Sequence, residues 1–163
     1  MENRMQEFRM PRYHEIPNVG LYLEQTIKYI NSCLAPLDIA VTASMVSNYV
    51  KKGYVDRPIK KQYYAEQIAY LLFLALAKQT LSMENIAALF ALQKKTYPGQ
   101  IAYDYFCQEL EDRLAATFQS VPVPETVDAE MPFAKRTLRS VIIALSHIIY
   151  LNYCFQNMSE EME

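Results

Sequence analysis

The sequence predicts an all-α protein, and three observations favour this fold class. The chain has 163 residues, of which 52% are hydrophobic, enough to bury a core within one domain of ordinary size. It contains only three glycines, too few for the many tight turns of a barrel or for a phosphate-cradling loop. Apolar residues recur at spacings near three and four, which is the period of an amphipathic helix.

The first part of the chain contains signals for a helix, a loop and a second, short helix. An irregular N-terminal arm is predicted for residues 1–20, and the helix that follows it should end at Pro36. Thr42 has the place of an N-cap for a short helix over residues 43–52, which Gly53 closes. This helix should bury one apolar face against the next long helix, so we expect the side chains at its inner positions to be enclosed: Val46, Tyr49 and Val50.

The next segment cannot be helical throughout. Residues 53–64 contain Pro58 at their centre and predict a small two-stranded wing or an extended loop. Residues 65–80 are strongly helical and nearly all apolar, which places their helix in the middle of the core. Ser82 then caps another short helix, so we assign residues 21–92 to one structural unit.

Two further helices are predicted in the C-terminal region. The first spans about residues 100–119, with Ile101, Tyr105, Leu110 and Leu114 on its inward side and a solvated face that carries Glu109, Glu111 and Asp112. A Pro-rich, acidic connector over residues 121–132 leads to the last helix, about residues 133–157. Residues 99–157 should dimerise or bind an effector, packed on the first unit as one compact body.

The last helix is apolar on almost every side, which is more surface than one neighbouring helix can cover. A second subunit is the commonest way to bury such a surface, so we expect a homodimer. The predicted dimer interface is the stripe that runs along this helix: Ile142, Leu145, Ile149 and Tyr153.

The charge of the chain is unevenly distributed. The formal net charge is −2, but residues 1–63 carry nine basic and six acidic side chains, whereas residues 64–163 carry seven and twelve. The basic half is therefore the candidate for a phosphate surface. Three widely spaced cysteines indicate neither a disulfide framework nor a zinc site, and they favour a reducing cytoplasm.

Several other functional classes are not indicated. The N-terminus lacks the apolar stretch of a signal peptide. Two apolar runs, residues 68–77 and 141–151, fall short of the about 20 residues needed to span a bilayer, so we expect no membrane insertion. No nucleophile-elbow, zinc-protease, phosphate-loop or dinucleotide-binding motif occurs, and we expect neither an enzyme nor a cofactor.

One segment is more informative than composition. The stretches VTASMVSNYVKKGYV, KQYYAEQIAYLL and TLSMENIAAL together resemble the winged helix-turn-helix of MerR-type transcription factors over about residues 41–90. That plan has a Ser/Thr-capped recognition helix with a Leu, a Tyr and a closing Gly, followed by a wing with a basic residue two before a Tyr. An apolar helix and a short helix opened by an apolar-Ser-apolar-acidic pattern come next. The corresponding residues are Thr42, Val46, Tyr49, Gly53, Lys61, Tyr63, Ile68, Leu71, Leu81, Ser82, Met83, Glu84 and Ile86.

The resemblance also has departures. The family has an Arg and a Glu beside the Tyr of its recognition helix, and those places hold Ser47 and Val50 here, so the phosphate contacts of that Arg do not carry over. Together with LYLEQTIKYI upstream, the chain is most similar to a small bacterial family of functionally uncharacterised MerR-like proteins. The resemblance implies a fold, a winged helix-turn-helix with additional C-terminal helices, and DNA binding.

The residues themselves support the same expectation. Recognition in the major groove uses small polar and amide side chains toward base edges and cations toward the flanking phosphates. We therefore expect double-stranded DNA as the partner, with the helix over residues 42–52 in the major groove and the wing on the backbone. The expected contact residues are Thr42, Ser44, Ser47, Asn48, Tyr49, Lys51, Lys52, Arg57, Lys60, Lys61 and Tyr63.

Two alternatives to a transcription regulator remain open at this stage. A helical protein-interaction module that lost its DNA affinity is one, favoured by the weak overall charge and the missing Arg. A small-molecule sensor is the other, because aromatic residues concentrate in the C-terminal half and could line a pocket for an apolar effector. Core packing and a dimer interface account for the same aromatic residues without a ligand.

Overall fold

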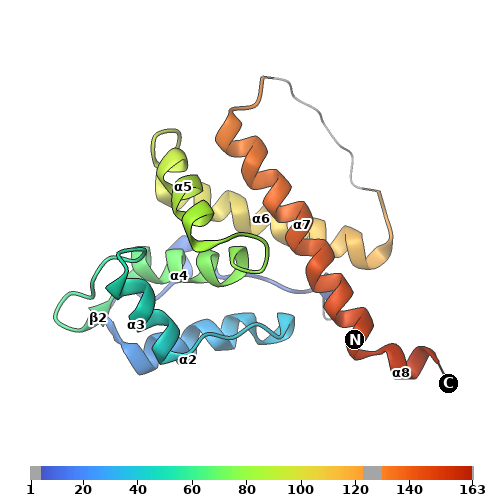
Figure 1. Cartoon of the computed structure of the whole chain (residues 1–163), viewed down its shortest axis with the longest axis horizontal. Coiled ribbons are helices and arrows are strands. Elements are labelled where there is room, and N and C mark those ends of the chain that lie inside the picture. Colours follow the sequence, from blue (N-terminus) through green and yellow to red (C-terminus); the bar gives the residue numbers. More distant parts are fainter. Residues whose placement is uncertain (1–4, 123–129, 163) are drawn as a thin grey trace.

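The computed structural model describes residues 5–122 and 130–162, and these are mostly helical (Figure 1). The all-α prediction is confirmed at this level. The predicted connector falls largely on residues 123–129, outside the described residues. In chain order the elements are η1 (Tyr13–Glu15), β1 (Leu21–Tyr22), α2 (Leu23–Leu34), η2 (Ala35–Leu37), α3 (Ala43–Lys51), β2 (Gln62–Tyr63), α4 (Ala65–Ala77), α5 (Met83–Lys94), α6 (Gly99–Gln119), α7 (Phe133–Gln156) and α8 (Met158–Glu161).

Helix α4 lies at the centre of the molecule, as its composition predicts. It packs against α2, α6 and α7, and nearly all of its side chains are buried. Ile68, Leu72 and Leu74 are fully enclosed. Because burying a Leu or Ile side chain contributes roughly 1.5 to 3 kcal/mol, this helix organises the elements around it.

Helices α2 and α3 are joined by a loop that a single side chain holds in place. Helix α2 ends at Leu34, just before Pro36, and the 3-10 turn η2 follows. The Asn31 side chain then clamps the backbone of Val41: its Nδ2 donates to the Val41 carbonyl at 2.9 Å, and its Oδ1 accepts from the Val41 N–H at 2.7 Å. This clamp sets where α3 begins relative to α2.

The only sheet in the described residues is a short antiparallel pair. Strand β1 pairs with β2, with Leu21 opposite Tyr63 and Tyr22 opposite Gln62. Immediately before β2 the chain reverses in a tight hairpin over residues 59–62, which we call the lysine hairpin because Lys60 and Lys61 form its tip. The segment expected to form a two-stranded wing or a loop therefore contains a hairpin, and its return strand β2 pairs with β1, which lies just before α2.

The inner side of α6 differs from the prediction at its first turn. Leu110 and Leu114 are fully buried as expected, but Ile101 is 59% exposed. The buried residues of this helix are Tyr103, Phe106, Cys107, Leu110, Leu114 and Phe118. The period is helical, as predicted, but it is shifted at the N-terminal end, where α6 extends past the core.

The predicted dimer stripe lies inside the subunit, which corrects the prediction. Ile142, Leu145 and Ile149 are 2%, 0% and 3% exposed, because α7 packs closely along α6. Tyr153 is half-buried, and its ring meets that of Phe118 with the centroids 5.2 Å apart. Ile142, Leu145 and Ile149 are therefore part of the core and are not free for a second subunit, and Tyr153 packs against that core.

Helix α7 is also longer than the apolar run at residues 141–151 that was considered as a possible membrane segment. Its 24 residues make it long and apolar enough to cross a membrane by length and composition alone, so the argument from insufficient length is wrong for this segment. About a third of its apolar window is buried within the subunit, where α7 packs against α4, α5 and α6. The absence of a membrane partner stays a prediction.

The N-terminal arm is fastened to α6 by an ion pair. The Arg12 guanidinium contacts both carboxylate oxygens of Glu111, and the Met10 N–H donates to the same carboxylate at 3.1 Å. Glu111 therefore does not belong to a solvated face, contrary to the prediction. The carboxylate also raises the pKa of Arg12, mainly through the hydrogen bond between them. The arm closes one side of the helical body.

Candidate nucleic-acid interface

Helix α3 presents a polar face to solvent and an apolar face to the core. Ser44, Ser47 and Asn48 are exposed, and with Lys51 they follow the i, i+3, i+4, i+7 spacing of one helix side. Val46 and Tyr49 point inward and are 0% and 4% exposed. The predicted burial of these two residues is confirmed, whereas Val50 is only half-buried.

The start of α3 is fixed by its cap. The Thr42 hydroxyl accepts a hydrogen bond from the Met45 N–H at 3.1 Å, which satisfies one of the free donors of the first turn. At the other end Gly53 adopts a φ of +81°, a left-handed conformation that glycine adopts without steric cost. The helix is thus short and closed at both ends, as predicted.

The lysine hairpin has an unusual backbone. The N–H of Ile59 donates to the Gln62 carbonyl and the N–H of Gln62 donates to the Ile59 carbonyl, both at 2.9 Å. The two residues between them, Lys60 and Lys61, have φ values of 51° and 66°. Asn and Gly usually take such positions, because a left-handed conformation costs most other residues roughly 1 to 2 kcal/mol.

A buried glutamine on α4 holds the chain that leads into this hairpin. The side-chain amide of Gln67 donates to the carbonyls of Asp56 and Arg57, at 3.2 and 2.9 Å. Its Oε1 accepts from the Tyr64 N–H at 2.9 Å. The sequence analysis missed this role, although a lone amide in an otherwise apolar helix could have indicated it.

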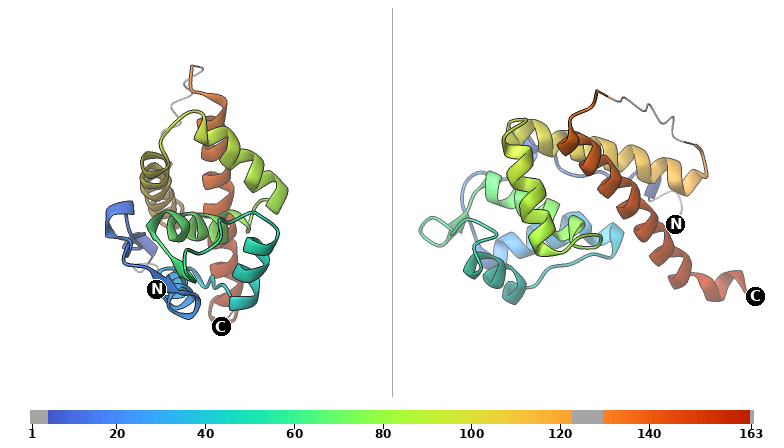
Figure 2. Two further views of the ribbon diagram at one scale, coloured as in Figure 1. Left: turned by 90° about the vertical axis from the view of Figure 1, so that its left-hand side faces the viewer. Right: turned by 45° about the horizontal axis from the view of Figure 1, so that its top comes forward.

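Cations collect around α3 and the lysine hairpin. Residues 42–63 carry five basic side chains and one acidic side chain, and all five basic side chains are exposed: Lys51, Lys52, Arg57, Lys60 and Lys61. None of the five takes part in an ion pair within the described residues. Figures 1 and 2 place α3 and the loop that follows it at one end of the molecule, away from α8.

Two of the predicted contact residues do not reach this surface. Tyr49 is buried, and its hydroxyl accepts a hydrogen bond from the Lys78 Nζ at 2.7 Å. Tyr63 is 4% exposed, because β2 packs on the core, and burial raises the pKa of its hydroxyl. Both residues support the surface from below. The remaining nine are exposed together at one end: Thr42, Ser44, Ser47, Asn48, Lys51, Lys52, Arg57, Lys60 and Lys61.

The described residues offer no group of three or more His, Cys, Asp or Glu side chains placed to hold a metal ion. Cys107 is fully buried on α6, where burial raises the pKa of its thiol to about 12. A thiol is weakly nucleophilic when it is protonated, and Cys107 packs within the hydrophobic core.

Comparison with known proteins gives one match. A family model described as a domain of unknown function (DUF1836) matches residues 11–106, which run from the N-terminal arm into the first half of α6. The searches of curated proteins and of solved structures found no match. The matched residues include the whole of α3, the lysine hairpin and α4.

Proposed function

The chain belongs to the DUF1836 family, and we propose that it binds double-stranded DNA and regulates transcription. In this proposal α3 lies in the major groove, and the lysine hairpin lies on the phosphates beside it. The proposal is supported by the order of α2, loop, α3, hairpin and α4, which resembles the plan expected for a MerR-like winged helix-turn-helix; in it β1 and β2 would form the base of the wing.

The observation that carries the proposal is the backbone of Lys60 and Lys61. Two adjacent non-glycine residues in the left-handed region are costly, and such strain is retained where the side chains serve a function. A tight turn of this kind projects both ammonium groups beyond the body of the protein. Phosphate oxygens are the partners that such groups meet on DNA.

The polar face of α3 supplies the chemistry for reading bases. An Asn side chain can pair with adenine through two hydrogen bonds, and Asn48 is exposed at the middle of α3. Ser44 and Ser47 are short enough to let the helix backbone approach the groove. Lys51 and Lys52 follow at the C-terminal end of α3, where they would neutralise phosphates on one edge of the groove.

We propose a homodimer as the DNA-binding form, with a different interface from the one predicted. Exposed apolar residues occur at the end of α7, on α8 and directly after it: Leu151, Phe155, Met158 and Met162. They lie at the end of the molecule opposite α3 (Figure 1). Two copies joined there would carry their α3 helices at the far ends of the dimer, which favours well-separated half-sites.

The direct test is a binding selection against random duplex DNA, followed by affinity measurements at several salt concentrations. Each phosphate contact contributes about 0.9 to the slope of log affinity against log salt. The double variant Lys60→Ala/Lys61→Ala should weaken binding to all sequences. It should also reduce the magnitude of the salt slope by the contribution of about two phosphate contacts. The control variant Lys94→Ala/Lys95→Ala removes the same charge from α5 and should leave the slope unchanged.

Asn48→Ala tests the reading of bases separately. It should relax sequence preference at one position of the selected site while leaving the salt slope as it is. A protein that selects no sequence, and whose weak binding is the same in both lysine variants, would contradict the proposal. That result would favour a helical protein-interaction module, for which Ser47 and Val50 in place of the Arg and Glu of MerR-type helices are the supporting feature.

A further inference from the structure

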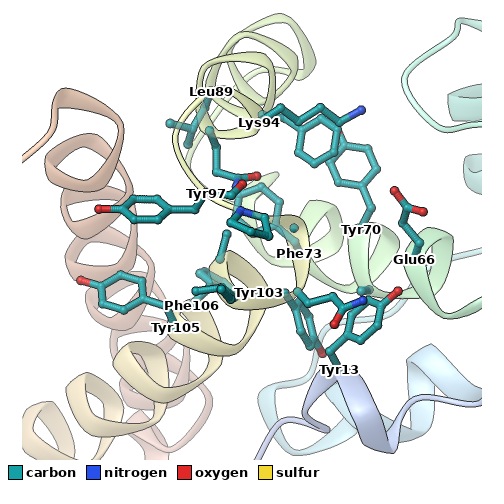
Figure 3. A pocket seen from close by; sticks show the side chains of 18 of the residues that line it. Tyr13, Glu66, Tyr70, Phe73, Leu89, Lys94, Tyr97, Tyr103, Tyr105 and Phe106 are labelled. Carbon is teal, nitrogen blue, oxygen red and sulfur yellow. The ribbon is translucent and has the colours of Figure 1, made fainter.

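A cavity lies between α4 and the helices that follow it in the chain. This cavity of about 520 Å³ opens between α4, α5, the start of α6 and the start of α7 (Figure 3). Its volume falls within the roughly 300 to 1,000 Å³ that small-molecule sites occupy. Apart from three residues of α7, all lining residues fall within the DUF1836 match.

Aromatic side chains contribute much of the cavity wall. Tyr70 and Phe90 lie against each other with ring centroids 4.2 Å apart, and Phe73 meets Phe106 edge-on at 4.9 Å. Leu89 and Leu138 complete the deep part and are buried. A cavity wall of aromatic rings and aliphatic side chains packs most favourably against a flat, apolar ligand.

The charged residues of the lining lie at its rim and balance one another. Asp56, Glu66 and Lys94 are exposed, and Lys135 is half-buried. The Lys94 and Lys135 ammonium groups already lie over rings of the protein, at 4.8 Å from the Phe90 centroid and 5.0 Å from the Tyr105 centroid. Two anionic and two cationic side chains give the rim no net charge, so the rim favours an uncharged ligand.

The aromatic rings also leave polar positions open. Among the described residues, the hydroxyl groups of Tyr70, Tyr97 and Tyr105 have no hydrogen-bond partner. In Figure 3 Tyr97 and Tyr105 extend toward α7, and Tyr70 lies on α4. They can donate to a ring nitrogen or oxygen at the edge of a ligand.

We infer that this cavity binds an uncharged, planar aromatic heterocycle. The ligand ring system stacks among Tyr70, Phe73 and Phe90, and a ring heteroatom accepts from a tyrosine hydroxyl at the rim. The cavity also touches the chain that leads into the lysine hairpin, because Asp56 and Gln67 are both lining residues and Gln67 holds the Asp56 carbonyl. Ligand binding therefore changes the exposure of the hairpin backbone; the further step to control of DNA binding rests on the proposed function.

Calorimetry on the full chain without DNA tests the site. The probe is acridine, which is uncharged at neutral pH, with aminoacridinium and acridine carboxylate as charged counterparts of the same ring. Acridine should bind with one site per chain and a negative heat-capacity change, and both charged forms should bind more weakly. Equal affinity for all three forms, or no binding of acridine up to its solubility, would overturn the inference.

Two variants locate the binding. Ala102→Trp fills the cavity from α6 and should abolish binding, whereas Ala88→Trp adds the same side chain to an exposed position of α5 outside the lining and should not. Phe90→Ala removes one stacking ring at the rim and should weaken binding by roughly tenfold, which keeps the test decisive if Ala102→Trp does not fold. Unchanged affinity in Phe90→Ala would place the ligand elsewhere.

Amide hydrogen exchange tests the link to the hairpin, again without DNA. Saturating acridine should slow exchange in residues 54–62 and leave α2 unaffected. Binding without any change in these residues would restrict the inference to a ligand site and refute the coupling. Because no DNA is present, a failure of either arm is distinct from a failure of the proposed DNA binding.

Discussion

Lys60 and Lys61 occupy adjacent left-handed positions, and the two 2.9 Å hydrogen bonds between Ile59 and Gln62 close the hairpin around them. The turn geometry suits Asn-Gly, yet both places hold lysine. Stability and charge therefore compete at this tip, and the competition can be measured.

The double variant Lys60→Asn/Lys61→Gly should separate the two effects. It relieves the backbone strain, so the free energy of unfolding should rise by about 1 kcal/mol in denaturant titrations. It also removes two cations from the tip, so affinity for DNA should fall. Lys60→Ala/Lys61→Ala is the control, because it removes the charges without relieving the strain. A variant that gained stability and kept its DNA affinity would show that the lysines have no role in binding.

The ends of the helices could be predicted from the sequence because local chemistry determines them. Pro36 stops α2, the Thr42 hydroxyl caps α3 and Ser82 caps α5, each through contacts within a few residues along the chain. The position of α4 in the core followed from its uniformly apolar composition. Periodicity and capping residues thus predicted the elements well.

What lies beside each helix could not be predicted in the same way. The apolar circumference of α7 indicated that it must be covered, but not that α6 covers Ile142 and Ile149 within one subunit. The same is true of the arm, since the pairing of Arg12 with Glu111 joins residues 99 positions apart. A resemblance to recognition helices placed Tyr49 on the DNA surface, whereas its spacing to Val46 correctly placed it inside.

Tyr49 should be a strong determinant of stability. Tyr49 is 4% exposed, and its hydroxyl accepts from Lys78, the residue that follows α4. Tyr49→Ala should lower the free energy of unfolding by roughly 3 kcal/mol or more, since it leaves a large cavity. Tyr49→Phe keeps the ring and should cost only about 1 kcal/mol. Chemical denaturation followed by circular dichroism measures both, and equal effects of the two substitutions would contradict the buried position.

Arg12 should hold the N-terminal arm on α6. The side chains of Arg12 and Glu111 are 12% and 9% exposed, so Arg12→Ala leaves a carboxylate with little solvent. We expect a loss of about 2 kcal/mol or more and faster proteolytic cleavage within the arm. Arg9→Ala is a matched control, because the Arg9 side chain is 71% exposed and its Nε lies 3.9 Å from the same carboxylate. Its effect should stay below about 0.5 kcal/mol, and arm cleavage should not change.

The proposed dimer makes opposite predictions for two positions on α7. Phe155 is 69% exposed, so Phe155→Asp should leave the fold intact and convert a dimer into a monomer in sedimentation velocity at micromolar concentration. Ile142 is 2% exposed inside the subunit, so Ile142→Asp buries an unpaired charge and should abolish folding rather than dissociate subunits. Met162→Asp, at an exposed position directly after α8, should weaken the dimer without loss of helix content. A wild-type protein that sediments as a monomer would contradict the interface, and it would also remove the reason to expect paired half-sites in the DNA.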